Sequence, residues 1–441
     1  MVANGRVVDI VDPDLGTVRE LGPLVQMSRT PARIERSAPR LGEHRGEWLA
    51  SRLPVPDATD LAEPVPPLAG FTILEVAYFI AGPLATAILA EMGARVLKVE
   101  PLDGDPYRRT GLQSAKFLHG KESVTLDLKH PDGRAILDTL LGRADVVVHS
   151  FRASAAAKLG LDADTVLQRN PRAVHLYAAS YGSRGPQRDR AAFHSTPNAL
   201  TGGGIKQAGE GNPPVNDSYA DPGSALGAAT AILFGLWGRE RSGTAQAMET
   251  TMLVSTGYIH SADMVVTDPP QPFPIADHEQ RGLSSTYRIY RCAGGHVFVA
   301  AVRPAEREAL LDLVGRPELV GAPDGEIAAV LETAFLARPA AEWAARLAAA
   351  GVGVAEVYPK QFDAWLEAQG LLLPVHHPAF GEYWRIGPKV DFSASAPVLA
   401  PACAAGEHSC DLLAELGFDQ SAIERLIAAG VTSDGRRKPN D

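Results

Sequence analysis

One histidine of this sequence lies where the chain could present it to a reactant. His194 ends the stretch GPQRDRAAFH, which begins with a Gly-Pro turn and follows a strand-like run at 173–182. An imidazole has an ordinary pKa of about 6.5, so it can exchange a proton near neutral pH, and it can also act as a nucleophile. A histidine in a turn can equally be a hydrogen-bonded structural group. Residue type alone therefore leaves catalysis and packing both open.

The other reactive side chains give weaker signals. The three cysteines have neither the even count of a disulfide framework nor the C-x-x-C spacing of a zinc or redox site, so we expect idle thiols at Cys292, Cys403 and Cys410. No pair of histidines has metal-ligand spacing with a nearby carboxylate, and no metal site is predicted. Six further histidines are interpreted as structural: His175, His260, His278, His296, His376 and His377.

A Rossmann-like sheet is predicted to position His194. The run FTILEVA at 71–77 is typical of a buried strand, 82–94 is predicted as a helix with Pro83 in its first turn, and 95–100 as a second strand. Strand and helix patterns then alternate through 123–129, 131–144, 145–151 and 173–182. Such alternation favours an α/β fold with a mostly parallel sheet.

A second, smaller domain is predicted beyond the helix at 223–243. The segment 285–302 has the pattern of a β-hairpin, and Ala-rich helices follow within 304–350. These elements indicate a small α+β domain. A length of 441 residues agrees with more than one domain, since domains average about 150 residues.

One segment near the N-terminus recurs near the C-terminus. Residues 12–28, DPDLGTVRELGPLVQMS, match residues 377–393, HPAFGEYWRIGPKVDFS, at Pro, Gly, Gly-Pro, Val and Ser in one register. Only this segment recurs, so the chain is not a solenoid. We expect the N-terminal segment to be the tail of a preceding copy of the domain; the alternative is an unrelated hairpin with common turn residues.

The organisation along the chain follows from these patterns. Five prolines without helical or strand period make 53–69 a stiff linker. The predicted parts are a C-terminal-type segment of a preceding copy at 1–52, the Pro-rich linker at 53–69, a large domain at 70–245, a linker at 246–280, a small domain at 281–365, a C-terminal return to the large domain at 366–430 and a polar tail at 431–441.

The turn after the first strand lacks a dinucleotide fingerprint. The sequence VAYFIAGPLAT has no G-x-G-x-x-G, and an NAD-dependent dehydrogenase is therefore disfavoured, although Glu100 ends the second strand where a ribose-binding acid would lie. The predicted helix N-terminus at 82–84 could accept a phosphate or a carboxylate through free backbone N–H groups. A purely structural turn explains the same spacing.

Composition excludes some classes of protein. The formal net charge of −10 argues against sequence-independent nucleic-acid binding, which needs a basic surface. No apolar run of 18 residues predicts a membrane span, and no signal-peptide pattern opens the sequence. We therefore predict a cytoplasmic protein with neither nucleic acid nor membrane as a partner.

In combination, several motifs resemble the class III CoA-transferases, also called the CaiB/BaiF family, which includes formyl-CoA transferase and α-methylacyl-CoA racemases. The resemblance covers about residues 68–430. It is carried by AGPLATAILAEMGARVLKVE, KESVTLDLKHPDGRAIL, ADVVVHSFRASAAAKLGL, NPRAVHLYAASYGSRGPQRDR, LGAATAILFGLWGRERSG and HPAFGEYWRIGPKVDFS. It implies a Rossmann-like large domain closed by both chain ends, a smaller α+β domain and an interlocked dimer.

The resemblance also implies the ligand and the residues that contact it. Acyl-CoA is expected as a substrate lying along the first βα turn, with a carboxylic acid as the second substrate and no tightly bound cofactor. Residues matching the family's contacts are Tyr78, Phe79, Ile80 and Ala81 on the turn, Phe151 beside it, Lys158 as a basic contact and Tyr181 near the thioester. The expected assembly is a homodimer or a heterodimer with a related chain.

His194 departs from the family pattern at the most important position. The family's GPxRDRPGYD aligns without a gap on GPQRDRAAFH, so His194 replaces the nucleophilic aspartate. A carboxylate can form an acyl anhydride that CoA thiolate reopens to an enzyme-bound thioester, whereas an imidazole cannot store CoA in this way. Pro101 after the second strand and Ser150 in place of the usual Asn are further departures. The standard aspartyl-CoA mechanism is therefore in doubt.

Two readings of the altered centre remain. Racemases of the superfamily use an acid/base pair, with a histidine one position earlier, at Phe193 here, and an aspartate that matches Asp221. We predict that His194 and Asp221 form such a pair, in a chain that transfers CoA by another residue or exchanges an α-proton. The alternative is a catalytically silent half of a tandem or heteromeric CoA-transferase, which the N-terminal repeat favours.

Overall fold

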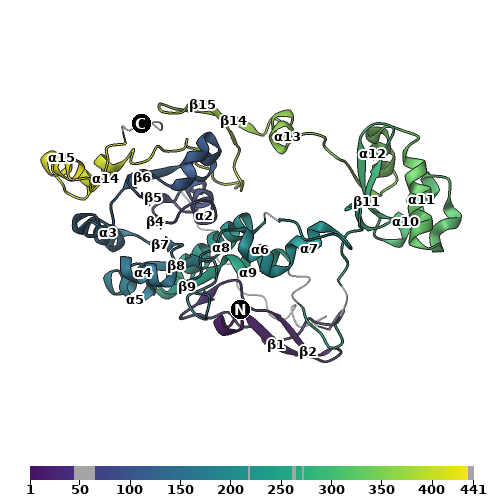
Figure 1. Cartoon of the computed structure of the whole chain (residues 1–441), viewed down its shortest axis with the longest axis horizontal. Helices are drawn as coiled ribbons and strands as arrows, with labels where there is room; N and C mark the ends of the chain where they lie inside the picture. The colour runs from purple at the N-terminus through teal and green to yellow at the C-terminus, as the bar shows by residue number, and fades with distance from the viewer. Residues whose placement is uncertain (44–64, 217–218, 261–264, 271–272, 436–441) are drawn as a thin grey trace. The chain divides into compact units, whose positions relative to one another are not determined.

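A computed structural model of the chain describes residues 1–43, 65–216, 219–260, 265–270 and 273–435. The chain forms two units, drawn in Figure 1: the larger contains 1–201, 218–271 and 372–441, and the smaller contains 202–217 and 272–371. Most of the predicted Pro-rich linker and most of the predicted polar tail lie outside the described residues.

A seven-stranded sheet forms the centre of the larger unit. Its order is β3-β9-β8-β7-β4-β5-β6, and every neighbouring pair is parallel except β3 with β9. The bounds are Gln26–Met27 (β3), Thr72–Val76 (β4), Arg95–Glu100 (β5), Lys121–Thr125 (β6), Val146–His149 (β7), Val174–Ala179 (β8) and Ala247–Thr251 (β9). The predicted mostly parallel sheet is confirmed.

The prediction that 246–280 is a linker was wrong in its first part. Residues 247–251 form β9, which pairs with β8, and helix α9 follows at Met252–Ile259. The strand is short and its sequence, AMETT, has no clear apolar alternation. Only pairing with strands far away in the sequence makes it part of the sheet.

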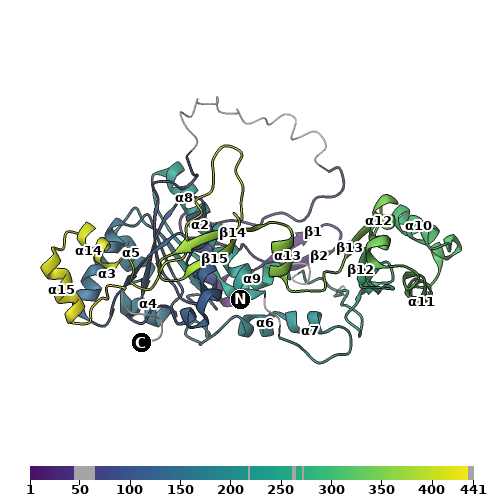
Figure 2. The same ribbon diagram turned by 90° about the horizontal axis from the view of Figure 1, so that it is seen from above.

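The two faces of this sheet bury separate cores because successive strand residues point to opposite sides. Ile73 packs with the helices α2 and α8, whereas Leu74 packs with α3, α14 and α15. Figure 2 shows α14 and α15 beside α3. In the described part of this unit the helices are α2 (Ala81–Glu91), α3 (Pro131–Arg143), α4 (Ala153–Leu159), α5 (Ala163–Arg169), α6 (Ser195–Thr201), α8 (Ala220–Ser242), α9, α14 (Ser409–Glu415) and α15 (Gln420–Ala428), with 3-10 helices η1 (Val2–Asn4) and η2 (Pro106–Phe117).

The repeated segment forms two hairpins of the same register. Strands β1 (Val7–Asp12) and β2 (Gly16–Leu21) pair Asp12 with Gly16, and β14 (Leu372–His377) and β15 (Gly381–Ile386) pair His377 with Gly381, at matched positions of the repeat. Gly16 has a φ of 73° and Gly381 a φ of 71°, a region that favours glycine. Both turns therefore need the same residue at the same place.

The smaller unit contains the predicted hairpin and Ala-rich helices. Its antiparallel sheet has the order β10-β11-β12-β13. Phe335 stacks on Tyr290 and packs against Trp343, with both ring centroids 4.8 Å away, so these aromatic rings form the centre of its core. The bounds are β10 (Gly282–Ser284), β11 (Tyr287–Arg291), β12 (His296–Ala300), β13 (Gly353–Glu356), α7 (Gly203–Ala208), α10 (Pro304–Leu313), α11 (Asp324–Phe335), α12 (Ala340–Ala349), α13 (Phe362–Ala368) and η4 (Pro317–Gly321).

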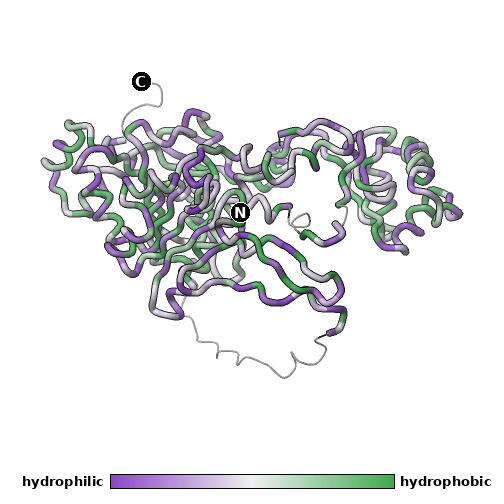
Figure 3. The backbone as a smooth tube through the Cα atoms, turned by 60° about the horizontal axis from the view of Figure 1, so that its bottom comes forward, coloured by the Kyte–Doolittle hydropathy of each residue, from purple (hydrophilic) through white to green (hydrophobic). Residues whose placement is uncertain are grey.

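Hydrophilic residues are interspersed along the described backbone of both units, as the purple segments of Figure 3 show. Within the ranges that the structure describes, no helix is both long and apolar enough to cross a membrane.

Candidate active site

The first βα turn is tightly built. It joins β4 to α2, and Phe79 within it has a φ of 67°, a left-handed conformation that side chains other than glycine rarely adopt. A Cβ atom added to Gly82 would lie 2.6 Å from the Cβ of Ala77, so a side chain there would collide with the end of the strand. Glycine at 82 therefore allows the first turn of α2 to approach β4 closely.

Asp105 supports the strained residue of this turn. The N–H of Phe79 donates to both carboxylate oxygens of Asp105, with N–O distances of 3.1 and 3.2 Å. The same carboxylate caps η2 by accepting from the N–H of Tyr107 at 2.9 Å. Nζ of Lys98 lies 3.0 Å from Asp105 and completes its environment. One buried acid thus ties the turn to the strand beside it.

Lys98 is fully buried among acceptors. Its Nζ lies 2.8 Å from a carboxylate oxygen of Glu75 and 2.8 Å from the carbonyl oxygen of Ala77, in addition to Asp105. Burial alone would lower the pKa of Lys98, but the neighbouring carboxylates outweigh this effect and raise it. Lys98 therefore remains a cation beneath the turn.

Glu75 joins Lys98 to a second buried lysine. Nζ of Lys121 lies 2.6 Å from Glu75 and 2.7 Å from the carbonyl oxygen of Pro83 in the first turn of α2. Burial lowers the pKa of Lys121 to about 8, although Glu75 opposes this. Burial raises the pKa of Glu75, but the two lysines overcome this and lower it. The network thus connects three adjacent strands with the helix start.

Glu100 belongs to the same buried region. It accepts from Arg108 at 2.5 Å, from the hydroxyl of Ser123 at 2.6 Å and from the N–H of Asp105 at 2.7 Å. Burial acts to raise its pKa, but Arg108, Lys98 and Ser123 lower it to about 2. The acid at the end of β5 is therefore engaged inside the protein.

The predicted contacts Tyr78 and Phe151 meet each other. Their ring centroids are 5.5 Å apart in an edge-to-face arrangement, and Nζ of Lys98 lies 5.7 Å from the centroid of Tyr78. Burial raises the pKa of Tyr78 to about 12, so the phenol stays neutral at ordinary pH. Together these rings join the turn to the end of β7.

Phe79 connects the turn to the loop that carries His194. Its ring meets that of Phe193 edge-to-face, with centroids 5.3 Å apart. Both rings remain partly exposed. Because Phe193 precedes His194, this contact places the histidine near the first βα turn.

The structure brings the side chains of His194 and Asp221 close to each other. Nδ1 of His194 lies 3.4 Å from Oδ2 of Asp221, whose side chain begins in the first turn of α8. The exposed fractions of the two side chains are 35% and 14%. Burial raises the pKa of Asp221, and His194 partly opposes this shift. The pair is therefore accessible and arranged so that a proton can pass between the two groups.

A carboxylate that the sequence analysis missed anchors the loop before His194. Oδ1 of Asp189 accepts from the N–H of Ser154 at 2.9 Å, in the first turn of α4, and Arg152 donates to the carbonyl oxygen of Asp189 at 3.2 Å. Arg152, the N-cap residue of α4, makes no side-chain cap bond, so Asp189 supplies one from elsewhere in the chain. Its only signal in the sequence was its place in the RDR motif.

Two other predicted residues are less engaged. Lys158 is exposed near the end of α4, and among the described contacts none joins its side chain to the first βα turn. Tyr181 is buried, with Arg190 5.9 Å from its ring centroid, and its hydroxyl has no hydrogen-bond partner within the described ranges. The remaining turn residues, Ile80 and Ala81, lie at the start of α2.

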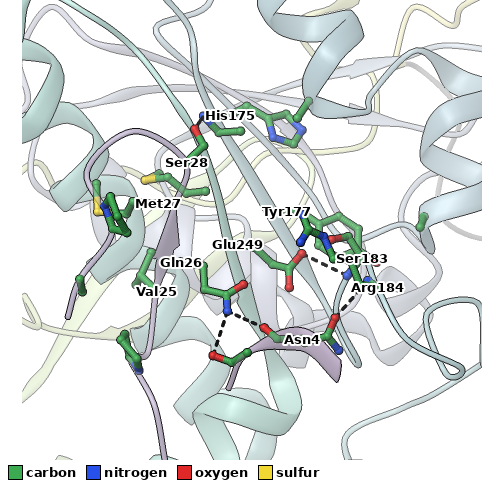
Figure 4. A pocket seen from close by; sticks show the side chains of 18 of the residues that line it. Asn4, Val25, Gln26, Met27, Ser28, His175, Tyr177, Ser183, Arg184 and Glu249 are labelled. Atoms are coloured by element: carbon green, nitrogen blue, oxygen red, sulfur yellow. Dashed lines mark hydrogen bonds between the residues drawn. The ribbon is translucent and has the colours of Figure 1, made fainter. Parts of the chain in front are cut away.

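A cavity of about 830 Å³ lies elsewhere in the larger unit, and none of the predicted site residues lines it. Figure 4 shows its wall, with Asn4, Val25 and Met27 from the N-terminal segment and Tyr177 and Glu249 from the sheet. The cavity is thus partly walled by the segment that precedes the predicted linker. Among the residues with a described structure, no His, Cys, Asp and Glu side chains group in a way that could hold a metal ion.

Comparison with known proteins identifies relatives of this chain. A probable fatty acyl-CoA transferase of Mycobacterium tuberculosis is 30% identical over 390 residues, covering 80% of this chain and 99% of that protein. Its crystal structure is similar with a TM-score of 0.68 and 27% identity, over 79% of this chain and 99% of that one.

Two more relatives differ from each other in activity. The beta subunit of a succinyl-CoA–L-malate CoA-transferase of Chloroflexus aurantiacus is 32% identical over 274 residues, covering 57% of this chain and 66% of that subunit. An alpha-methylacyl-CoA racemase of Mus musculus is 28% identical over 398 residues, covering 85% of this chain and 99% of that protein. The sequence model of CoA-transferase family III matches residues 68–409. The chain therefore belongs to CoA-transferase family III.

Proposed function

We propose that this chain binds an acyl-CoA thioester along its first βα turn and that His194 and Asp221 exchange the proton on the carbon next to the thioester carbonyl. The observation that carries the proposal is the 3.4 Å contact between these two side chains. Relatives named as CoA-transferases and as an acyl-CoA racemase support a CoA thioester as the substrate. CoA is then a substrate and not a resident cofactor.

The chemistry needs a base, an acid and a stabilised enolate. A thioester carbonyl acidifies the neighbouring C–H bond, so the neutral imidazole of His194 can take the proton while the electron pair moves into the enolate. The carboxylate of Asp221 stabilises the imidazolium that forms. Return of a proton to carbon, from the imidazolium of His194 or from Asp221 after the imidazolium has passed its proton to that carboxylate, regenerates the thioester. Burial favours the protonated form of Asp221, which agrees with such a role.

The turn supplies the binding surface in this proposal. Tyr78, Phe79 and Phe151 offer aromatic contacts. The start of α2, at Ala81, offers free backbone N–H groups to an anionic part of CoA. Lys158 remains proposed as a basic contact, and Tyr181 as a neighbour of the thioester.

CoA transfer with Asp221 as the carrier is a second candidate. Asp221 is the carboxylate that the structure brings beside His194. Its attack on the thioester carbonyl would form an acyl anhydride and release CoA thiolate. The thiolate would then attack the Asp221 carbonyl, releasing the first acid and leaving CoA on Asp221. An incoming carboxylate would accept CoA through the reverse steps.

One experiment separates these reactions. Purified chain is incubated in deuterated water with propionyl-CoA and isotopically labelled acetate, and mass spectrometry follows deuterium at the α-carbon and CoA transfer to acetate. We expect deuterium uptake that His194→Gln and Asp221→Asn abolish, with CoA binding retained by calorimetry. Asp103→Asn, an exposed acid outside the site, is the matched control and should behave as the parent.

The other outcomes are also informative. CoA transfer that survives His194→Gln and is lost in Asp221→Asn would establish the second candidate in place of the first. CoA binding with neither reaction would contradict both and favour a silent half of a larger enzyme. Transfer that both variants retain would assign the carrier to another residue.

We also propose that the working assembly contains two interlocked family chains. The relative from Chloroflexus aurantiacus is named as a beta subunit, which supports pairing of unlike chains in this family. Residues 1–52 are proposed to derive from a preceding copy, and the two matching hairpins support that origin. Sedimentation velocity of the purified chain, alone and with a co-expressed family chain, would distinguish homodimer from heterodimer.

A further inference from the structure

The segment that follows each repeated hairpin differs in burial and pairing between the two ends of the chain. We call Gly22–Ser28 the N-terminal copy and Gly387–Ser393 the C-terminal copy; their sequences are GPLVQMS and GPKVDFS. The matched valines differ in exposure, at 4% for Val25 and 41% for Val390. One copy is therefore buried on a surface, and the other is open to solvent.

The N-terminal copy lies on the edge strand β9. It contributes β3, in which Gln26 pairs with Glu249 and Met27 with Met248. Val25 enters the same hydrophobic core as Met248. Figure 4 shows this segment beside Glu249. A strand added in this way satisfies the backbone groups of a sheet edge and covers its apolar face.

Two further residues of this region bind the same edge. The N–H of Ser28 donates to the carbonyl oxygen of Ala247 at 2.9 Å, and the N–H of Ala247 lies 3.2 Å from the hydroxyl of Ser28. The hydroxyl of Thr30 accepts from the side-chain amide of Gln246 at 2.8 Å. The N-terminal copy therefore contacts the β9 edge through an apolar valine (Val25) and a serine (Ser28), and the hydroxyl of Thr30, two residues after Ser28, adds a further contact.

The C-terminal copy retains the groups that make these contacts. Val390 matches Val25, and Ser393 matches Ser28. An apolar Phe392 takes the place of Met27, and the hydroxyl of Ser395 takes that of Thr30. By contrast, Asp391 replaces Gln26, whose side-chain amide donates to the carbonyl oxygens of Asn4 and Gly5 and not to β9.

Nothing in the described part of this chain covers the C-terminal copy beyond its beginning. Lys389 is held by Glu91, through an N–O distance of 3.3 Å from its backbone and 2.5 Å from its Nζ. From Val390 to Ala394 the residues are exposed, Phe392 at 40%, and no hydrogen bond within the described ranges involves their backbone. A segment with an exposed valine, an exposed phenylalanine and free backbone groups is suited to pairing with a sheet edge.

We infer that the C-terminal copy docks on the β9-type edge of a second CoA-transferase family chain, one whose own edge carries no N-terminal copy. The family match begins at residue 68, so the N-terminal copy lies outside the family domain. On a family chain without this extension, no N-terminal copy would occupy that edge. Backbone pairing with a serine and a hydroxyl at matched positions supplies the recognition.

The arrangement selects an unlike partner. In this chain the N-terminal copy already occupies β9, so a second copy of the same chain presents no free edge. A shorter family chain presents one and can accept Val390 and Phe392 where Val25 and Met27 lie here. The C-terminal copy is thus a recognition strand for a partner that lacks the N-terminal extension.

A peptide-binding experiment tests this without CoA or catalysis, so its result is independent of the proposed function. The probe is a fluorescent peptide of residues 384–396, and the acceptor is the full chain with Val25→Asp, which releases the N-terminal copy from β9. Val11→Asp, at an exposed valine of β1, is the matched control. Fluorescence anisotropy should show at least about tenfold tighter binding to V25D than to the parent or to V11D.

A second acceptor variant keeps the test valid if Val25→Asp fails to fold. Ser28→Pro removes the N–H that donates to Ala247 at the margin of the same contact, with no charge placed in the core. Both acceptors are checked by circular dichroism before binding. A peptide carrying Val390→Asp and Phe392→Asp should lose the binding. Equal binding to parent, control and both variants, or no binding to folded V25D and S28P, would overturn the inference.

Discussion

The two ends of the candidate site are held by different means. Beneath the first βα turn, Lys98, Glu75 and Asp105 are buried and in mutual contact through Lys98. At the reacting end, His194 is partly exposed and meets Asp221 at 3.4 Å, within a loop anchored by Asp189. The turn is thus fixed by interactions inside the protein, whereas the reacting loop is fixed by a few contacts near the surface.

This difference predicts that substitutions act differently at the two ends of the candidate site. A new side chain at 194 disturbs one partly exposed contact. Removal of one member of the buried network would leave a charge without a partner in the interior, which is costly. The proposed binding end is therefore expected to tolerate little substitution, and the proposed reacting end is expected to tolerate more.

The largest effect should come from breaking the buried network. Lys98→Met leaves Glu75 and Asp105 without their shared cation, and we expect a loss of about 3–5 kcal/mol in the free energy of unfolding. Urea denaturation of the full chain measures it. The control is Arg19→Met, which breaks the exposed pair with Asp9 and should leave the free energy of unfolding nearly unchanged. Similar losses in both variants would remove the distinction between the two ends.

The buried network should also make the free energy of unfolding depend on pH in the acidic range. The pKa of Glu100 is about 2 in the folded chain and ordinarily 4.5, so its stabilising contribution is complete above pH 4.5 and is lost as the pH falls toward 2. The loss should be of the order of 3 kcal/mol. Urea denaturation at a series of pH values should show a flatter dependence between pH 4.5 and 2 in Glu100→Gln. An unchanged slope in this variant would contradict the assignment.

A smaller effect is expected where the two ends meet. Phe193→Ala removes the edge-to-face contact with Phe79, a type of contact that contributes about 0.5–1.5 kcal/mol. We expect KM for the acyl-CoA to rise by about three- to tenfold, while the free energy of unfolding falls by no more than about 1.5 kcal/mol. Leu200→Ala, at an exposed position of α6, should leave KM unchanged. If Phe193→Ala lowered the free energy of unfolding as much as Lys98→Met does, Phe193 would belong to the buried network beneath the first βα turn and not to the surface loop.

The smallest effect should come from the loop anchor. Asp189→Asn keeps an oxygen that can accept from Ser154 but removes the negative charge at the start of α4, which interacts favourably with the helix dipole. We expect a modest decrease of kcat with KM nearly unchanged, since the loop positions His194. Steady-state kinetics measures both constants. If Asp189→Asn lowers the free energy of unfolding but leaves kcat unchanged, the role of Asp189 is structural only.

Local patterns predicted the central βαβ unit well. The strand at 71–77, the helix at 82–94 and the strand at 95–100 appear as β4, α2 and β5 within a few residues. Each has a clear apolar period and a turn at its ends, so local sequence is sufficient to identify it. The strand β9 was missed because its five residues have no such period and depend on distant partners.

Sequence motifs pointed to some residues of the candidate site and gave no sign of others. The pairing of His194 with Asp221 followed from matching the family motif, and the structure brings the two together. Asp105 was not predicted, although it accepts from the N–H of Phe79. No local pattern marks a carboxylate that supports a turn 26 residues away.

The sequence by itself determined the alternation of strands and helices, the repeated segment and the presence of a histidine at the end of GPQRDRAAFH. These features are local or are visible by comparison of one segment with another. Only the tertiary structure decided that Glu100 is engaged inside the protein, that Asp189 caps α4, and that Val25 is buried while Val390 is exposed. Their roles depend on which backbones approach each other in the folded chain, and this closeness is not encoded in any local spacing of residue types.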